Sequence, residues 1–278
     1  MVIDFHTHTF PDAIAEKAIA GMQQRSHAAA FGSGTASGLI TAMEQAGICR
    51  SVVLPVATNP AKVSSINTVS MESGCQQLIY FGAMHPLAEN WKEELDRLCA
   101  AGVPGIKIHP QYQGVDITDI RYLRILDYAA QRGLITVMHA GDEIAYPGVV
   151  RCSPEMVRSV CDQLGKIPLV LAHMGGWKNW ERVAENLQDT GCYLDTAISL
   201  GQIAALPDGH YAPEDLPLLS ESDFVSLVRA FGSHRILFGT DSPWADQAEE
   251  IKKITVLPLT QEEIENILSH NAIRLLGF

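Results

Sequence analysis

The chain has 278 residues, of which 47% are hydrophobic, and this composition provides a sizeable core and excludes a largely disordered protein. Its 32 acidic and 20 basic residues give a formal charge of −12, which argues against nucleic acid or an anionic membrane surface as a partner. No basic and apolar leader follows Met1, and no apolar run approaches the roughly 18 residues that span a bilayer. We therefore expect a cytoplasmic protein.

Eight short apolar runs, rich in β-branched residues, alternate along the chain with longer amphipathic segments. Near-continuous apolar strands of this length are typical of a parallel sheet that is buried on both faces. The expected strands are Val2–Phe5, Ser51–Pro55, Leu78–Ala83, Gly105–Ile108, Ile135–Met138, Leu169–Ala172, Cys192–Leu194 and Arg235–Phe238.

The segments between the strands carry helical patterns and helix-boundary residues. Ser153 before Pro154 is typical of an N-cap, and Gly133 is typical of the position just beyond a helix C-terminus. The expected helices are Trp91–Ala101, Ile120–Arg132, Pro154–Leu164 and Glu262–Leu276. This alternation predicts the α/β class and a (β/α)₈ TIM barrel formed by one domain, residues 1–278. An open doubly wound sheet is the alternative, but no G-x-G-x-x-G follows a strand.

Two connections are long, Thr9–Gly38 after the first expected strand and Ser199–Asp223 after the seventh. The first is expected to contain a helix and then a mobile stretch rich in Ala and Gly, and the second is rich in proline and acidic residues. Long loops after barrel strands commonly form lids or pocket walls, and inert insertions are the other interpretation.

The six cysteines stand singly in apolar stretches, and no two of them form a C-x-x-C motif. Thiols in such surroundings are typically buried and reduced, as in cytoplasmic proteins. We therefore expect buried, reduced side chains at Cys49, Cys75, Cys99, Cys152, Cys161 and Cys192.

Polar residues stand at the C-terminal ends of several expected strands, the end at which TIM-barrel enzymes carry their active sites. His6 and His8 are two residues apart on one strand, so their side chains share a face and can bind one metal ion. His139 and Asp241, each at the end of another strand, would complete a site of three histidines and one aspartate with a position open for water. Such ligands suit Zn²⁺, and also Fe²⁺, Mn²⁺ or Ni²⁺.

Other interpretations of these residues stay open. Asp241 in Thr-Asp-Ser-Pro also suits a helix N-cap. Lys107 has three interpretations: an ion pair with an acidic residue such as Asp4 or Asp241, a contact to a substrate carboxylate or phosphate, or a carboxylated lysine that bridges two metals. His109 is expected at the rim, as a substrate contact or a local hydrogen-bonding group.

Four aromatic residues lie near the expected mouth of the barrel and either line an aromatic substrate pocket or pack between helices. They are Tyr112, Trp177, Trp180 and Trp244, of which Trp244 is our candidate for substrate binding.

Five motifs, in order along nearly the whole chain, resemble the family 2 branch of the amidohydrolase superfamily of TIM-barrel metal-dependent hydrolases. They are Asp4-Phe5-His6-Thr7-His8, Gly105-Ile106-Lys107-Ile108-His109-Pro110, Met138-His139-Ala140-Gly141, Leu171-Ala172-His173-Met174-Gly175-Gly176 and Phe238-Gly239-Thr240-Asp241-Ser242-Pro243. The resemblance implies one or two divalent ions, with zinc expected, and His6, His8, His139 and Asp241 as ligands. It also implies His173 as a second ligand or catalytic imidazole, and keeps Lys107 as a ligand of a second metal.

These residues predict a hydrolase in which a metal-activated water cleaves an amide, lactone or ester bond of a small molecule. Asp241 would act as the base, and His173, with Lys107, would polarise the carbonyl oxygen. The alternative is a non-oxidative decarboxylase of an aromatic or muconate-type acid, and a more distant one is a non-catalytic metal-binding barrel. We expect a small-molecule substrate and neither nucleic acid nor membrane as a partner, and leave a homo-oligomer open.

Overall fold

The computed structural model describes residues 1–278, apart from the side chain of Pro213. The chain divides into two compact units. The first unit combines the two ends of the chain, Met1–Val53 and Thr196–Phe278, and the second is the continuous segment Leu54–Asp195. Among the described residues, no helix has the length and apolarity needed to cross a bilayer.

The centre of the first unit is strand β1 (Ile3–Thr7), all of whose residues are buried. It pairs in parallel with β2 (Arg50–Val53). On its other side the N–H of Phe5 donates to the carbonyl of Phe238, just after β9 (Ile236–Leu237), at 2.7 Å. The N–H of Asp241 donates in turn to the carbonyl of His6 at 2.7 Å, so Asp241 lies beside the C-terminal end of β1.

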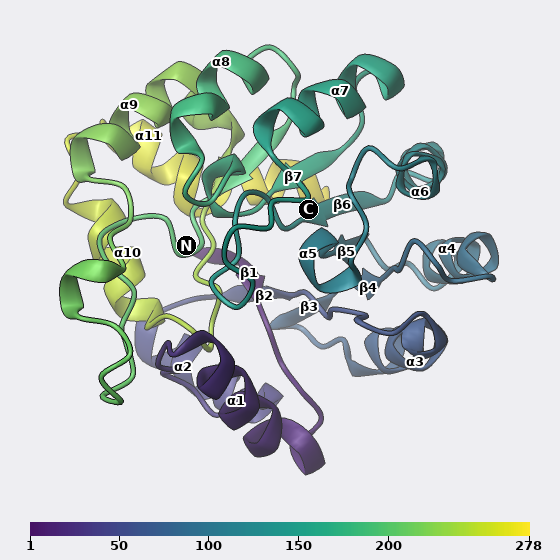
Figure 1. The fold of residues 1–278 in the computed structure, drawn as a ribbon, viewed down its shortest axis with the longest axis horizontal. Coiled ribbons are helices and arrows are strands. Elements are labelled where there is room, and N and C mark those ends of the chain that lie inside the picture. The colour runs from purple at the N-terminus through teal and green to yellow at the C-terminus, as the bar shows by residue number, and fades with distance from the viewer. The chain divides into compact units, whose positions relative to one another are not determined.

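Helices of the first unit cover these strands, and α2 packs against α10 (Figure 1). The predicted helix Glu262–Leu276 is present, but a π-helical segment, Asn266–His270, divides it into α11 and α12. The α-helices are α1 (Asp12–Ser26), α2 (Ala36–Ala46), α9 (Glu221–Phe231), α10 (Gln247–Thr255), α11 (Gln261–Glu265) and α12 (Asn271–Leu276). The short helical turns of this unit are η4 (Pro213–Asp215) and η5 (Ser233–Arg235).

The two long connections lie side by side in the first unit. Ala28 pairs with Ala205 in an antiparallel bridge, and Nδ1 of His27 lies 2.7 Å from a carboxylate oxygen of Asp208. The first connection contains α1, as predicted, and these contacts are made by the stretch after it, whose mobility stays a prediction. That the connections are pocket walls stays a prediction.

The second unit contains a parallel sheet in the order β4-β5-β6-β7-β8. The predicted strand Leu78–Ala83 is split into β3 and β4, because the ladder is interrupted at Phe81. The strands of this unit are β3 (Leu78–Tyr80), β4 (Gly82–Ala83), β5 (Gly105–Ile108), β6 (Ile135–Met138), β7 (Leu169–Leu171) and β8 (Tyr193–Asp195).

In the second unit α3, α4, α6, α7 and α8 pack successively against one another (Figure 1). The predicted boundaries are confirmed where cap residues mark them. The Ser153 hydroxyl accepts the N–H of Met156, and Gly133 has a φ of +71° beyond α6. The helices are α3 (Val63–Ser73), α4 (Trp91–Ala100), α5 (Pro110–Gln113), α6 (Ile120–Gln131), α7 (Pro154–Leu164) and α8 (Val183–Leu187), with short turns η1 (Pro60–Lys62), η2 (His173–Gly175) and η3 (Trp180–Arg182).

The prediction of buried side chains at all six cysteines is wrong for part of the set. Cys49 and Cys75 are exposed, because both lie in connections that lead into strands, and Cys99 is half-buried. Cys152, Cys161 and Cys192 are buried, and the Sγ atoms of the last two lie 3.7 Å apart.

Gly141, after β6, provides the first test. It has a φ of +90°, and a Cβ placed there would lie 2.1 Å from the backbone nitrogen of Trp177. We expect Gly141→Ala to lower the free energy of unfolding by about 2 kcal/mol or more, a fall in Tm of about 4–8 °C. Gly148→Ala in the same loop, at φ +76° with open space around it, is the matched control for backbone strain alone. Equal falls in calorimetric Tm would show that the approach to Trp177 does not matter.

Candidate active site

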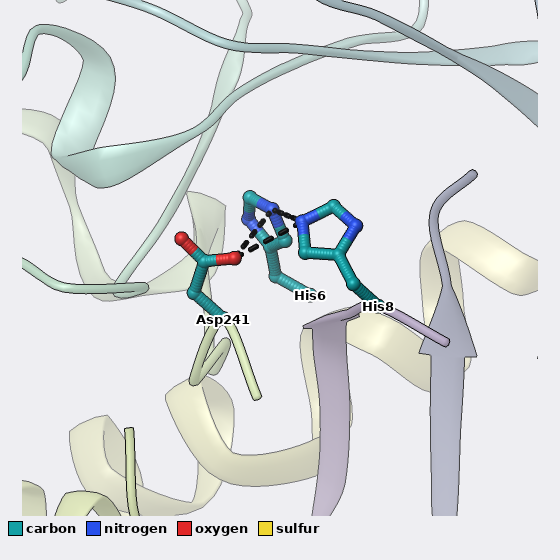
Figure 2. Close-up of side chains that lie close together, drawn as sticks. All are labelled: His6, His8 and Asp241. Carbon is teal, nitrogen blue, oxygen red and sulfur yellow. Dashed lines mark hydrogen bonds and ion pairs between the residues drawn. The ribbon is translucent and has the colours of Figure 1, made fainter. Parts of the chain in front are cut away.

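Three predicted metal ligands of the first unit converge at the C-terminal end of β1 (Figure 2). Strand alternation directs His6 and His8 to one side, and their Nε2 atoms lie 3.2 Å apart. Oδ1 of Asp241 lies 3.0 Å from Nε2 of His8 and 3.6 Å from Nε2 of His6. His6 and Asp241 are buried and His8 is half-buried.

The geometry of this cluster fits a metal ion. Two ligands at about 2.0–2.1 Å from one Zn²⁺ lie about 3.0–3.4 Å apart when the angle at the metal is roughly 90–110°. The His6–His8 separation of 3.2 Å and the His8–Asp241 separation of 3.0 Å lie in this range, and the His6–Asp241 separation of 3.6 Å corresponds to a wider angle of about 120°. The two imidazole planes are inclined by 70°, so both in-plane lone pairs can point to one position. Two imidazoles and a carboxylate suit zinc and manganese alike.

The buried carboxylate of Asp4 links the two segments that carry these ligands. Its Oδ1 accepts the N–H groups of His6, at 3.1 Å, and Thr240, at 3.0 Å. Its Oδ2 accepts the Thr240 hydroxyl at 2.6 Å and the Gln247 side-chain amide at 2.7 Å. Asp4 therefore holds β1 against the residue that precedes Asp241.

Asp241 is not a helix N-cap. It has a φ of +63°, and the N-cap of α10 is Asp246, whose side chain accepts the N–H of Glu249 at 3.0 Å. The alternative interpretation of Asp241 is therefore wrong, because the N-cap of the helix lies five residues later. Its left-handed conformation is sparsely populated by residues other than glycine and is compatible with a functional constraint.

A second group of histidines lies in the second unit, at the ends of β6 and β7. Nδ1 of His139 is 3.0 Å from Nε2 of His173, and the two rings are inclined by 65°. Burial, followed by the nearby His109 and His173, lowers the pKa of His139 well below its ordinary value. A neutral imidazole has a lone pair for a metal, so His139 fits the role of a metal ligand.

His109 lies in a stack rather than in a convergent cluster. Its ring is parallel to that of Tyr112, with centroids 3.8 Å apart, and nearly parallel to that of His139, with centroids 4.1 Å apart. Because imidazole lone pairs lie in the ring plane, stacked rings cannot both direct them at one ion. His109 also caps α5 by accepting the N–H of Tyr112 at 3.5 Å, which confirms the local hydrogen-bonding interpretation. Its contact with substrate stays a prediction.

Sequence reasoning missed two acidic residues of this second group. The Asp195 side chain, at the end of β8, accepts the N–H of His173 at 3.0 Å. Oε2 of Glu143 lies 3.6 Å from Nε2 of both His109 and His139. A glutamate four residues after a strand-end histidine is the only sequence signal for Glu143, and Asp195, as the last residue of a strand, follows the same rule as the predicted ligands.

The remaining predicted residues have these positions. Lys107 is buried on β5, opposite Val137 of β6. Trp177 is buried, and the half-buried Trp180 donates its indole N–H to the carbonyl of His173 at 2.9 Å. Trp244 is half-buried, and its backbone N–H donates to the carbonyl of Asp241 at 2.8 Å. A substrate-binding role for Lys107 or Trp244 stays a prediction.

The sequence profile of the amidohydrolase family matches residues 3–278. The chain belongs to the amidohydrolase family. This confirms the resemblance found in the five motifs, and it supports metal-dependent catalysis on small molecules. No curated protein matches the sequence.

Solved structures similar to this amidohydrolase confirm the fold as a TIM barrel. An uncharacterised TIM-barrel protein from Bordetella bronchiseptica has a TM-score of 0.76 at 18% identity, over 99% of this chain and 98% of that one. A 5-carboxyvanillate decarboxylase from Novosphingobium aromaticivorans, with bound manganese, has a TM-score of 0.72 at 11% identity, over 100% and 97%. A putative 2-pyrone-4,6-dicarboxylic acid hydrolase from Pseudomonas putida has a TM-score of 0.63 at 15% identity, over 99% and 97%.

Asp4 provides a pH-dependent test in the metal-free protein. Burial raises its pKa from 3.8 to about 7, against the hydrogen bonds from Thr240, Gln247 and His6 that lower it. Between pH 3.8 and about pH 7, Asp4 keeps its proton in the folded protein but has lost it in the unfolded chain. The proton bound by the folded state therefore stabilises it fully below about pH 4, and this contribution is lost as pH rises through about 7.

The stability advantage of the wild type over Asp4→Asn should therefore shrink from about pH 5 to about pH 8. Urea unfolding at the two pH values, with metal removed by a chelator, measures this advantage. A wider advantage at the higher pH would instead show a carboxylate that stays charged throughout.

Proposed function

We propose that this amidohydrolase is a hydrolase that cleaves an amide, lactone or ester bond of a small molecule with a metal-activated water. The observation that carries the proposal is the cluster of His6, His8 and Asp241, whose donor atoms have the spacing of ligands to one ion. Family membership supports it, because the five motifs that carry these residues and their partners lie within the matched residues 3–278.

His139 is the proposed fourth ligand. TIM-barrel enzymes take their active-site residues from the C-terminal ends of several strands, and His139 directly follows β6. When bound, the ion would lower the pKa of a water molecule toward neutrality and polarise a carbonyl group. We propose that the site binds one or two zinc ions. Manganese, which is bound in the Novosphingobium decarboxylase, is the alternative metal to test.

The chain's own residues would then move protons and orient the substrate. The carboxylate of Asp241 would accept the proton of the attacking water and pass it to the leaving group. Nε2 of His173 would donate to the carbonyl oxygen as negative charge develops there. Lys107 would bind an acidic group of the substrate, or in its carboxylated form hold a second ion together with His173. His109 and Trp244 would contact the substrate.

A decarboxylase is the second candidate, because a barrel of the same fold carries out that reaction in Novosphingobium. Lys107 would then hold the substrate carboxylate, and Asp241 or His173 would handle the proton of the ring. Both candidates imply a small-molecule substrate, and we propose the cytoplasm as the location of either.

Asp241→Asn tests the proposed metal centre. Loss of a charged ligand and of the base should lower zinc content and reduce hydrolysis about a hundredfold or more. Metal analysis and steady-state kinetics of the purified variant measure the two effects. Asp246→Asn, the nearby helix cap, is the matched control and should retain both metal and activity. A metal-free wild type, or an unaffected Asp241→Asn, would contradict the proposal.

A substrate panel separates the two reactions. The protein, loaded in turn with zinc and with manganese, is incubated with lactones, esters and amides, and separately with hydroxybenzoates and muconates. We expect acid or amine release from the first group, detected in a pH-stat or by chromatography, and no CO₂ from the second. Release of CO₂ that disappears in Asp241→Asn would establish the decarboxylase instead.

A further inference from the structure

The turn after β6 holds the ring of His139 through the nitrogen that faces away from His173. Nε2 of His139 lies 2.9 Å from the backbone carbonyl oxygen of Asp142. A carbonyl oxygen only accepts hydrogen bonds, so Nε2 carries the ring proton. In the neutral ring the lone pair is then on Nδ1, the atom that lies 3.0 Å from Nε2 of His173.

The plane of the same ring is set by its neighbours in the aromatic stack. His109 lies 13° from parallel to His139, and Tyr112 lies 2° from parallel to His109. Nδ1 of His109 accepts the backbone N–H of Tyr112, so the proton of this second imidazole is also on Nε2. The two Nε2 atoms lie on the same side of the stack, since each is 3.6 Å from one carboxylate oxygen.

The carboxylate of Glu143 occupies that side. It is 8% exposed, and its Oε2 lies 3.6 Å from Nε2 of each of the two histidines. Its Oε1 accepts the Tyr112 hydroxyl at 3.2 Å and the N–H of Ala145 at 3.1 Å, which fix the carboxylate in place. A negative charge beside both Nε2–H groups favours this tautomer over the one with the proton on Nδ1.

We propose that Glu143 is a positioning residue for His139: with the Asp142 carbonyl, it holds the ring proton on Nε2 and so presents Nδ1 as the metal ligand. The inference rests on the proposed function, in which His139 binds the ion. It does not make Glu143 a ligand, because the stacked rings of His109 and His139 cannot share an ion with it. Substitution of a residue that holds a metal ligand in place typically lowers metal affinity by about 10–100-fold.

Glu143→Gln is the sharpest test, because the amide oxygen can still accept from Tyr112 and Ala145 while the charge is lost. Zinc affinity is measured by competition with a chromophoric chelator, and Co²⁺ is added separately to record its absorption bands. We expect zinc affinity to fall about tenfold or more, the cobalt bands to shift, and the metal-free Tm to stay unchanged. Tyr112→Phe, which removes one anchor of the carboxylate, should weaken zinc binding in the same direction and by less. Glu185→Gln, with a 76% exposed side chain in the same unit, is the charge-matched control.

The possible results separate this inference from the proposed function. If the wild type binds zinc and Glu143→Gln binds it equally tightly with unshifted cobalt bands, the role of Glu143 is wrong and the proposed function stands. A loss of affinity matched by a fall in the metal-free Tm would show a structural role and would also overturn the inference. A wild type that binds neither zinc nor cobalt would overturn both.

Discussion

The carboxylate of Asp4 is the interaction on which the geometry of the first unit depends. It is fully buried, and it takes hydrogen bonds from the backbone of β1, from Thr240 and from the first turn of α10 through Gln247. Burial of a carboxylate costs free energy unless hydrogen-bond donors surround it. Asp4 is therefore stable in the core only when β1, Thr240 and Gln247 keep their donors in place around it. The consequence is that His6 and Asp241, more than 200 residues apart in the chain, have one fixed relation.

Ring orientation distinguishes the two histidine groups more clearly than distance does. In both units, nitrogen and oxygen donors lie within 4.8 Å of one another in sets of three. The rings of His6 and His8 are strongly inclined, whereas those of His109 and His139 are stacked. A lone pair confined to the ring plane makes the first arrangement suitable for a shared ion. The second is suitable for fixing a ring, which is consistent with Nδ1 of His139 turning toward His173.

The fold was predictable to a large extent, because strands buried on both faces and helices with cap residues leave local signals. The structure differs from the predicted elements where the deciding feature leaves no mark in the local sequence. Composition does not show that the ladder is interrupted at Phe81, since Leu78–Ala83 is apolar throughout. The Leu and Ile stripe of the last helix likewise hides its π-helical segment, because a single wide turn hardly changes the periodicity.

Strand alternation and motif order were enough to indicate the fold class and to predict site residues at strand ends, namely His6, His8, His139, His173 and Asp241. The three-dimensional arrangement was needed to show which of these residues approach one another within a unit and that Asp241 is not a helix cap. It was also needed to show that Glu143 and Asp195 contact the histidine group. The physical reason is that a hydrogen bond depends on the direction of a ring or a carbonyl in three dimensions. Spacing along the chain carries no such information for residues in different loops.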